Sequence, residues 1–255
     1  MPDEETQPTY DKVYNDPEAD LILVSSDNVS FKIFKYHLQS CSYVFREMVS
    51  SLDGPTQANV SHSKIEFTDP QLENAATLRL FLDIVTSRQP ELKREILAPL
   101  RDCILFAKKY ECQIVFPSLS MMARQLLKAD ISRHYIFIIA ALVDDVDLAA
   151  SAIIQAGKWH WPSEDIADPS GWLTNSDTKV PMEPGLLGVN KGAGVMEISS
   201  WPLSDINRLP LPYLVALMKV NRKFPLTPES GVQIAAASYF EKLMAEWNKS
   251  ALAEY

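Results

Sequence analysis

The sequence predicts an α+β fold, in which a small sheet near the start of the chain is followed by surrounding helices. Two observations support this prediction. Residues 21–24 and 31–34 are short apolar runs separated by turn-forming residues, which indicates a β-hairpin. The residues that follow show mainly helical periodicity, unlike the regular alternation of strands and helices in a parallel nucleotide-binding sheet.

Length and charge limit the class of protein. The chain has 255 residues, close to the size at which one hydrophobic core stops growing, so one compact unit or two modest domains are both possible. A hydrophobic content of 47% against 22% charged residues is typical of a soluble globular protein. The net charge of −9 disfavours nucleic acid as a partner, because phosphate binding needs a basic face.

The ends and the cysteines point to an intracellular chain, in cytoplasm or nucleus without distinction. The longest apolar stretch, residues 136–143, is about half the length needed to cross a bilayer, so we expect no membrane partner. Residues 1–17 are acidic and polar, lack the features of a signal peptide, and are expected to be disordered. The 3 cysteines do not form a disulfide framework, and we expect free thiols.

The elements of the first half follow from apolar spacing. After the hairpin, the pattern predicts helices over 36–40 and 43–51, with Ser42 as the cap of the second. A loop over 52–63 then leads to a strand over 64–68. Pro99 moves the start of one later helix towards Ala98. The helices expected next cover residues 75–87, 98–111 and 119–129.

The second half is expected to be mostly helical. Residues 132–142 and 146–156 form a predicted helix pair, with the turn at Asp144-Asp145. An irregular segment rich in proline and glycine covers about 158–207. Helices over 212–220 and 230–249 close the chain. The apolar face predicted for the last helix consists of Val232, Ala235, Ala236, Tyr239, Leu243 and Trp247.

The order of elements over residues 18–129 resembles that of the BTB/POZ domain. The likeness is carried by Asp20 before the first strand, by the strand 31–35, by Leu38, and by the Ser-x-x-Phe of 42–45. Phe34 stands where the family commonly has histidine. The remaining residues, 130–255, are similar to the helical extensions of small fungal-type BTB proteins. The resemblance therefore implies a BTB/POZ-like domain followed by a mostly α-helical region.

The resemblance implies a non-enzymatic scaffold or adaptor that binds protein, either a second copy or another BTB protein. Asp20 and Lys35 match the acidic and basic positions that face each other in the charged pocket of dimeric BTB domains. One alternative is a substrate adaptor of a cullin-3-type ubiquitin ligase, although residues 49–55 lack the aliphatic-x-Glu motif such adaptors often carry. Another alternative is a nuclear transcription cofactor.

The residues themselves indicate no reaction chemistry. His37 and Cys41 could share a helix face, but no further ligands accompany them, so we expect no metal. The glycines of 185–194 match neither phosphate-binding pattern, so we expect no cofactor and no small-molecule substrate. The least favoured alternative is an enzyme with a site in 158–207, because no nucleophile–base constellation is present.

Three tryptophans in the irregular segment form a second candidate binding patch. Trp159, Trp161 and Trp172 are large aromatic residues among prolines and glycines. Such residues either fix the segment to the helical core or form an exposed patch for a partner. Both interpretations remain open from the sequence.

Overall fold

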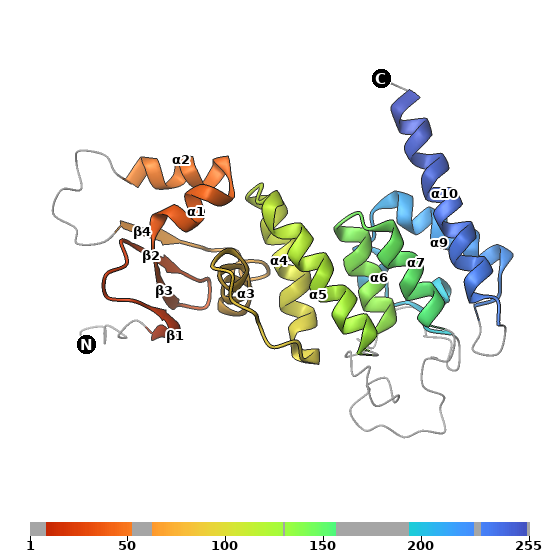
Figure 1. Cartoon of the computed structure of the whole chain (residues 1–255), viewed down its shortest axis with the longest axis horizontal. Helices are drawn as coiled ribbons and strands as arrows, with labels where there is room; N and C mark the ends of the chain where they lie inside the picture. Colours follow the sequence, from red (N-terminus) through yellow and green to blue (C-terminus); the bar gives the residue numbers. More distant parts are fainter. Residues whose placement is uncertain (1–8, 53–62, 130, 157–193, 227–230, 254–255) are drawn as a thin grey trace. The chain divides into compact units, whose positions relative to one another are not determined.

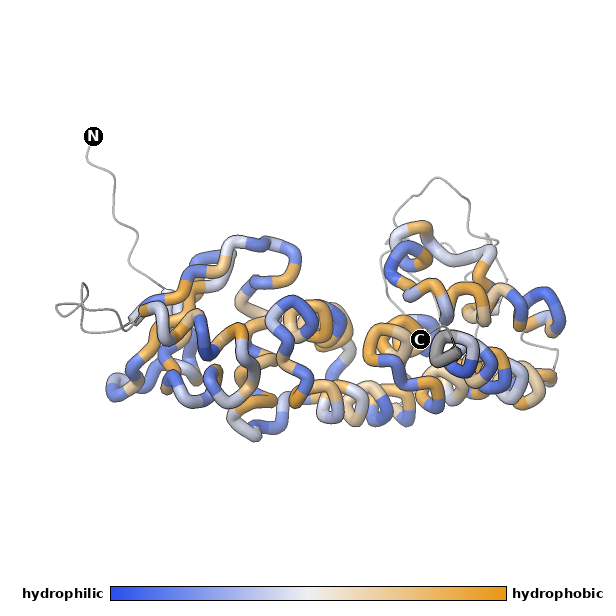
Figure 2. Tube along the Cα trace, turned by 90° about the horizontal axis from the view of Figure 1, so that it is seen from above, coloured by the Kyte–Doolittle hydropathy of each residue, from blue (hydrophilic) through white to orange (hydrophobic). Residues whose placement is uncertain are grey.

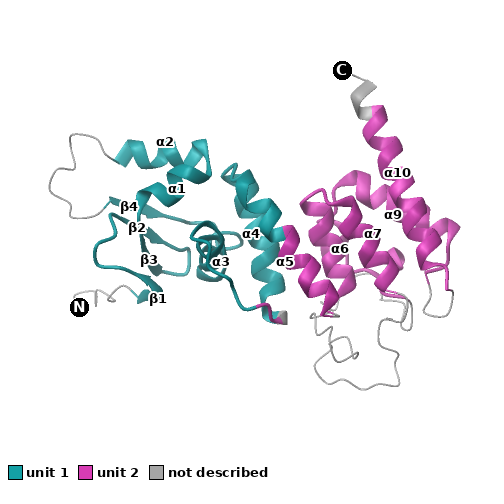
Figure 3. Cartoon of the chain, in the orientation of Figure 1, with its two compact units in different colours: residues 1–91, 95–119 teal, residues 92–94, 120–255 magenta. Residues whose placement is uncertain are grey.

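The computed structural model describes residues 9–52, 63–129, 131–156, 194–226 and 231–253. It confirms the α+β class, with a mixed four-stranded sheet and a larger number of helices (Figure 1). The chain divides into unit 1, residues 1–91 and 95–119, and unit 2, residues 92–94 and 120–255 (Figure 3). Along the chain, the two units meet between residues 119 and 120, inside helix α5 (Phe116–Lys128). The domain boundary expected from the sequence, between 129 and 130, lies just after the end of this helix.

The sheet of unit 1 is built around the predicted hairpin. Its strand order is β1 (Thr9–Asn15), β3 (Val29–Ile33), β2 (Leu21–Val24) and β4 (Ser63–Glu66). Strands β2 and β3 are antiparallel, whereas β1 is parallel to β3 and β4 is parallel to β2. The hairpin turn contains Asn28, whose φ of 62° is one that asparagine tolerates better than most residues. The predicted hairpin is therefore confirmed.

Strand β1 corrects the expectation that residues 1–17 are disordered, which is wrong for Thr9–Asn15. The strand is held by polar contacts with helix α3 (Ala75–Val85) in addition to its pairing with β3. The Tyr14 hydroxyl donates to Asp83 Oδ1 at 2.8 Å, and Arg79 forms an ion pair with Asp11. The Tyr14 side chain is also buried, beside the ring of Phe31. These partners are remote in sequence, which is why local composition did not indicate the strand.

Replacing Tyr14 by phenylalanine is expected to lower the free energy of unfolding by about 1 kcal/mol, because the hydrogen bonds of a buried hydroxyl are lost while the ring is kept. Urea denaturation of the full chain measures this change. The matched control is Tyr10→Phe in the same strand, which is expected to change stability by less than about 0.5 kcal/mol. Equal effects of the two changes would contradict the role given to the Tyr14 hydroxyl.

An aromatic cluster forms the core of unit 1. Phe45, Phe81 and Phe106 are fully buried, and their ring centroids lie 5.0 to 6.1 Å apart, a favourable range for aromatic pairs. Orange and blue segments alternate along the helices in Figure 2, as expected where one face is buried. The remaining helical elements of this half are α1 (Lys35–Cys41), α2 (Tyr43–Leu52), η2 (Arg94–Ile96), α4 (Leu97–Lys109) and η3 (Gln113–Val115).

Unit 2 is helical in the described ranges. Helix α6 (Arg133–Leu142) is buried along its whole length, which is typical of a central helix. Its predicted partner α7 (Val146–Gln155) is capped by Asp145, whose carboxylate accepts the Leu148 N–H at 2.9 Å. The other elements are η4 (Ile198–Ser200), α8 (Leu203–Ile206), α9 (Leu211–Lys223) and α10 (Gln233–Ala253).

The segment expected to be irregular, 158–207, is described from residue 194 onward, and this part contains η4 and the single turn α8. Trp201 anchors it, since its side chain is 2% exposed and its indole N–H donates to the Val195 carbonyl at 2.8 Å. The rest of the segment lies outside the described residues. No helix in the described ranges combines the length and the apolar character needed to span a membrane.

Helix α10 buries only part of the apolar face that the sequence predicted, with Ala236 as its fully buried member. The buried positions are Ala236, Ala237, Phe240 and Met244. The predicted face included Leu243 and Trp247, but Leu243 is half-buried and Trp247 is 42% exposed. The apolar residues of α10 therefore form two stripes. Unit 2 covers the stripe with Phe240 and Met244, and the stripe with Leu243 and Trp247 is at least partly exposed.

Candidate interaction surface

The hairpin places Asp20 beside the start of α1. Leu21 pairs with Ile33 across β2 and β3, so Asp20 lies at the end of the pair, near the point where α1 begins at Lys35. The Asp20 Oδ1 atom accepts the Lys35 main-chain N–H at 2.7 Å. This contact satisfies one of the N–H groups that a helix leaves unpaired at its first turn. The two predicted site residues thus meet through the main chain of Lys35.

Aromatic residues flank Lys35 in the chain, and a further one begins α2. Tyr36 is 59% exposed, its ring stacks on Phe34 with centroids 6.0 Å apart, and it lies 4.0 Å from the His37 ring. Tyr43, at the start of α2, is 63% exposed. We call this set the α1 surface: Asp20, Phe34, Lys35, Tyr36, His37 and Tyr43.

Buried neighbours explain why these tyrosines face solvent. Leu38 and Phe45 are fully buried and fix the inner sides of α1 and α2. Ser42 ends α1 and caps α2, because its Oγ accepts the Phe45 N–H at 3.1 Å. Tyr36 and Tyr43 lie two residues before these anchors, which puts them on other sides of their helices. Exposed tyrosines of this kind suit a contact with another protein, since they bury a large area and offer a hydroxyl.

His37 and two cysteines near the α1 surface, Cys41 and Cys112, are uncharged at neutral pH. Burial lowers the pKa of His37, so its imidazole is neutral. Burial raises the pKa of the Cys41 thiol, and raises that of Cys112 to about 12. All three cysteines of the chain are free, as expected, and protonated thiols are poor nucleophiles.

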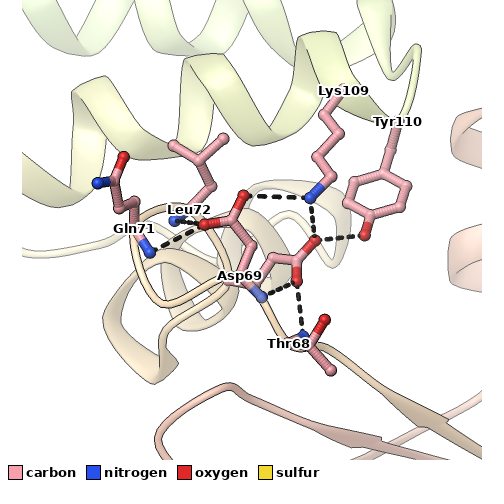
Figure 4. A network of polar contacts seen from close by, with 7 residues as sticks. Thr68, Asp69, Gln71, Leu72, Lys109 and Tyr110 are labelled. Carbon is pink, nitrogen blue, oxygen red and sulfur yellow. Dashed lines mark hydrogen bonds and ion pairs between the residues drawn. The ribbon is translucent and has the colours of Figure 1, made fainter.

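A second polar cluster of unit 1 is organised by Glu73, which is 2% exposed (Figure 4). Its Oε1 accepts hydrogen bonds from Lys109 Nζ at 2.7 Å and from the Tyr110 hydroxyl at 2.5 Å. Its Oε2 accepts the N–H groups of Thr68 and Asp69 at 2.8 and 2.7 Å. The cluster fixes the loop between β4 and α3 to the end of α4.

The carboxylate of Glu73 is stabilised in its charged form. Burial alone would raise the pKa of Glu73, but the hydrogen bonds from Lys109, Tyr110 and the main chain outweigh it and lower the pKa. The hydrogen bond with Glu73 raises the pKa of Lys109. Both oxygens of the carboxylate already accept two donors each, so no acceptor capacity is left for a substrate proton.

Unit 2 contains a buried histidine beside an acidic residue. His134 is fully buried, and its Nε2 lies 3.8 Å from Asp205 Oδ2. Asp205 is itself buried and accepts a hydrogen bond from Arg208 Nη1 at 2.5 Å. Burial lowers the pKa of His134 to about 4, partly opposed by the charge of Asp205. A histidine with no exposed surface cannot reach a substrate, so we assign this pair to the core.

The candidate residues from the sequence have different outcomes. Asp20 and Lys35 lie together at the α1 surface, whereas Trp159, Trp161 and Trp172 lie outside the described residues. The sequence reasoning missed Tyr36 and Tyr43. A signal was available in the sequence: Tyr36 and Tyr43 stand two positions before the apolar residues Leu38 and Phe45, a spacing that puts them on other sides of their helices. Among the described residues, no group of three or more His, Cys, Asp or Glu side chains could hold a metal ion.

Comparisons with known proteins add no assignment. No family model matches the chain. No curated protein and no solved structure matches it either.

Proposed function

We propose that unit 1 is a protein–protein association module of the BTB/POZ type, which binds a second copy of the chain through the α1 surface and catalyses no reaction. The observation that carries this proposal is the exposure of Tyr36 and Tyr43, at 59% and 63%, the first directly after Lys35 in α1 and the second at the start of α2. The order of strands and helices in unit 1 and the sequence likeness over 18–129 support it.

The mode of binding follows from the chemistry of the surface. Stable interfaces bury about 1,600 Å² in total, and a few aromatic residues near the centre contribute most of the affinity. Tyr36 and Tyr43 supply the apolar area, and the exposed carboxylate of Asp20 gives the rim its charge. A two-fold interface would present the same residues from both copies.

Replacing Tyr36 and Tyr43 together by alanine is expected to weaken self-association at least about 30-fold, because hot-spot residues of this type contribute about 2 kcal/mol or more. Sedimentation velocity of the full chain over a concentration series measures the dissociation constant. Far-UV circular dichroism verifies that the variant is folded.

The matched control is Met121→Ala, which removes a side chain of similar exposure, 57%, from unit 2. Its association constant is expected to equal that of the unaltered chain. The proposal fails if the Tyr36→Ala/Tyr43→Ala chain associates as strongly as the control.

A further inference from the structure

Unit 2 has an open groove between α9 and α10, lined by both apolar and charged side chains. The groove has a volume of about 210 Å³. Its lining residues are Pro212, Val215, Ala216 and Lys219 from α9, and Leu243, Glu246, Trp247 and Ser250 from α10. Trp247 is the largest of them and is 42% exposed. Large exposed tryptophans are costly to hydrate and are typical centres of protein interfaces.

The groove belongs to the second apolar stripe of α10. The buried stripe ends at Met244, and residues 245–250 are all exposed. Figure 1 shows the C-terminal part of α10 extending past α9. Leu243 and Trp247 lie one turn apart on this stripe and therefore face the same side. The described part of unit 2 leaves that side uncovered.

The two walls of the groove carry opposite charges. Lys219 stands on the α9 wall and Glu246 on the α10 wall, and both side chains are exposed. A two-fold axis that runs along the groove places the α9 wall of one copy opposite the α10 wall of the other. Each Lys219 then faces a Glu246, twice per pair of copies. Within one chain, Glu246 Oε1 lies 3.9 Å from Nζ of the exposed Lys242. Exposed ion pairs of this spacing contribute little energy, so Glu246 can give up Lys242 for a lysine of a second copy.

We propose that this groove binds the same groove of a second copy of the chain, with Trp247 of each copy packed against the α9 wall of the other. The interface is isologous, because one patch supplies both sides. It is separate in sequence from the α1 surface and does not depend on it.

Charge reversal in a chain that also carries Tyr36→Ala and Tyr43→Ala tests this contact apart from the α1 surface. In that background, Lys219→Glu alone and Glu246→Lys alone are each expected to weaken dimerisation at least about tenfold, because each creates two like-charge contacts. An equimolar mixture of the two is expected to restore the dimer, because opposite charges then meet at both positions. Sedimentation velocity measures all three.

Matched controls use exposed charges of α10 outside the groove, namely Lys249→Glu and Glu241→Lys. These are expected to leave dimerisation unchanged, whereas Trp247→Ala is expected to abolish it. Dimerisation that survives Lys219→Glu, Glu246→Lys and Trp247→Ala overturns the proposal. A mixture that stays monomeric also overturns it and indicates an occupant other than a second copy. Because every chain in this test already carries Tyr36→Ala and Tyr43→Ala, its dimerisation reports on the groove, and a failure of the proposed α1 contact would leave these results unchanged.

Discussion

Replacing Glu73 by alanine is expected to lower the free energy of unfolding of unit 1 by about 3 kcal/mol. The N–H groups of Thr68 and Asp69 and the Tyr110 hydroxyl each lose an acceptor, and each loss costs about 1 kcal/mol at these partly buried positions. Lys109 adds little, because its side chain is 41% exposed and water can replace the lost partner.

Amide hydrogen exchange of the β4 and α3 segments measures this change within unit 1. The matched control is Glu66→Ala, which removes a carboxylate that is 63% exposed and paired with Lys64. That control is expected to cost less than about 1 kcal/mol. Similar losses for Glu73→Ala and Glu66→Ala would show that the buried cluster does not hold the loop.

Acidification from pH 7 to pH 5 is expected to destabilise unit 2 by about 2 kcal/mol through His134. Its pKa is about 4 in the folded chain and 6.5 as the ordinary value. In the unfolded chain His134 therefore binds a proton below pH 6.5, whereas in the folded chain it binds one only below about pH 4. The stability linked to His134 is complete above pH 6.5 and is lost as the pH falls towards 4.

The variant His134→Gln removes this titration, and its stability is expected to change little between pH 7 and pH 5. Amide exchange in α6 and α8 measures the difference, since it reports on unit 2 separately. His37→Asn is the control, because that histidine belongs to unit 1 and leaves the pH dependence of unit 2 unchanged. An equal pH dependence of unaltered chain and His134→Gln would assign the acid sensitivity to other groups.

Local patterns predicted the hairpin and the positions of most helices. The apolar runs of β2 and β3 flank a turn that suits Asn28, so neighbouring residues specify the structure. Pro99 correctly predicted a late start for α4, which begins at Leu97. Asp145 was expected at a turn before a helix, and it caps α7.

Contacts between distant residues could not be predicted in this way. The order of β1 depends on Arg79 and Asp83, which lie in α3. The role of Glu73 depends on Lys109 and Tyr110 at the end of α4. Neither pairing leaves a periodic signal in the sequence, because ion pairs and hydrogen bonds need no fixed spacing.

Helix α10 shows the limit of periodicity itself. Its residues at 236, 240 and 244 and those at 239, 243 and 247 both repeat with helical spacing. The two stripes are similarly apolar, so tertiary packing decides which one is buried. The same limit applies to the α1 surface, where Asp20 and Lys35 were expected to meet, while the exposure of Tyr36 and Tyr43 depends on how Leu38 and Phe45 pack.

Strand β1 also determines where the chain can be shortened. It pairs with the side of β3 that faces away from β2. Without β1, the main-chain N–H and C=O groups on that side of β3 would have no neighbouring strand. A chain that starts at residue 18 would present β3 as an edge strand, with the buried Phe31 close to the new border. Open edges of this kind pair readily with other chains and promote aggregation. Removal of residues 9–15 would therefore move the edge of the sheet from β1 to β3 and bring it next to a core residue.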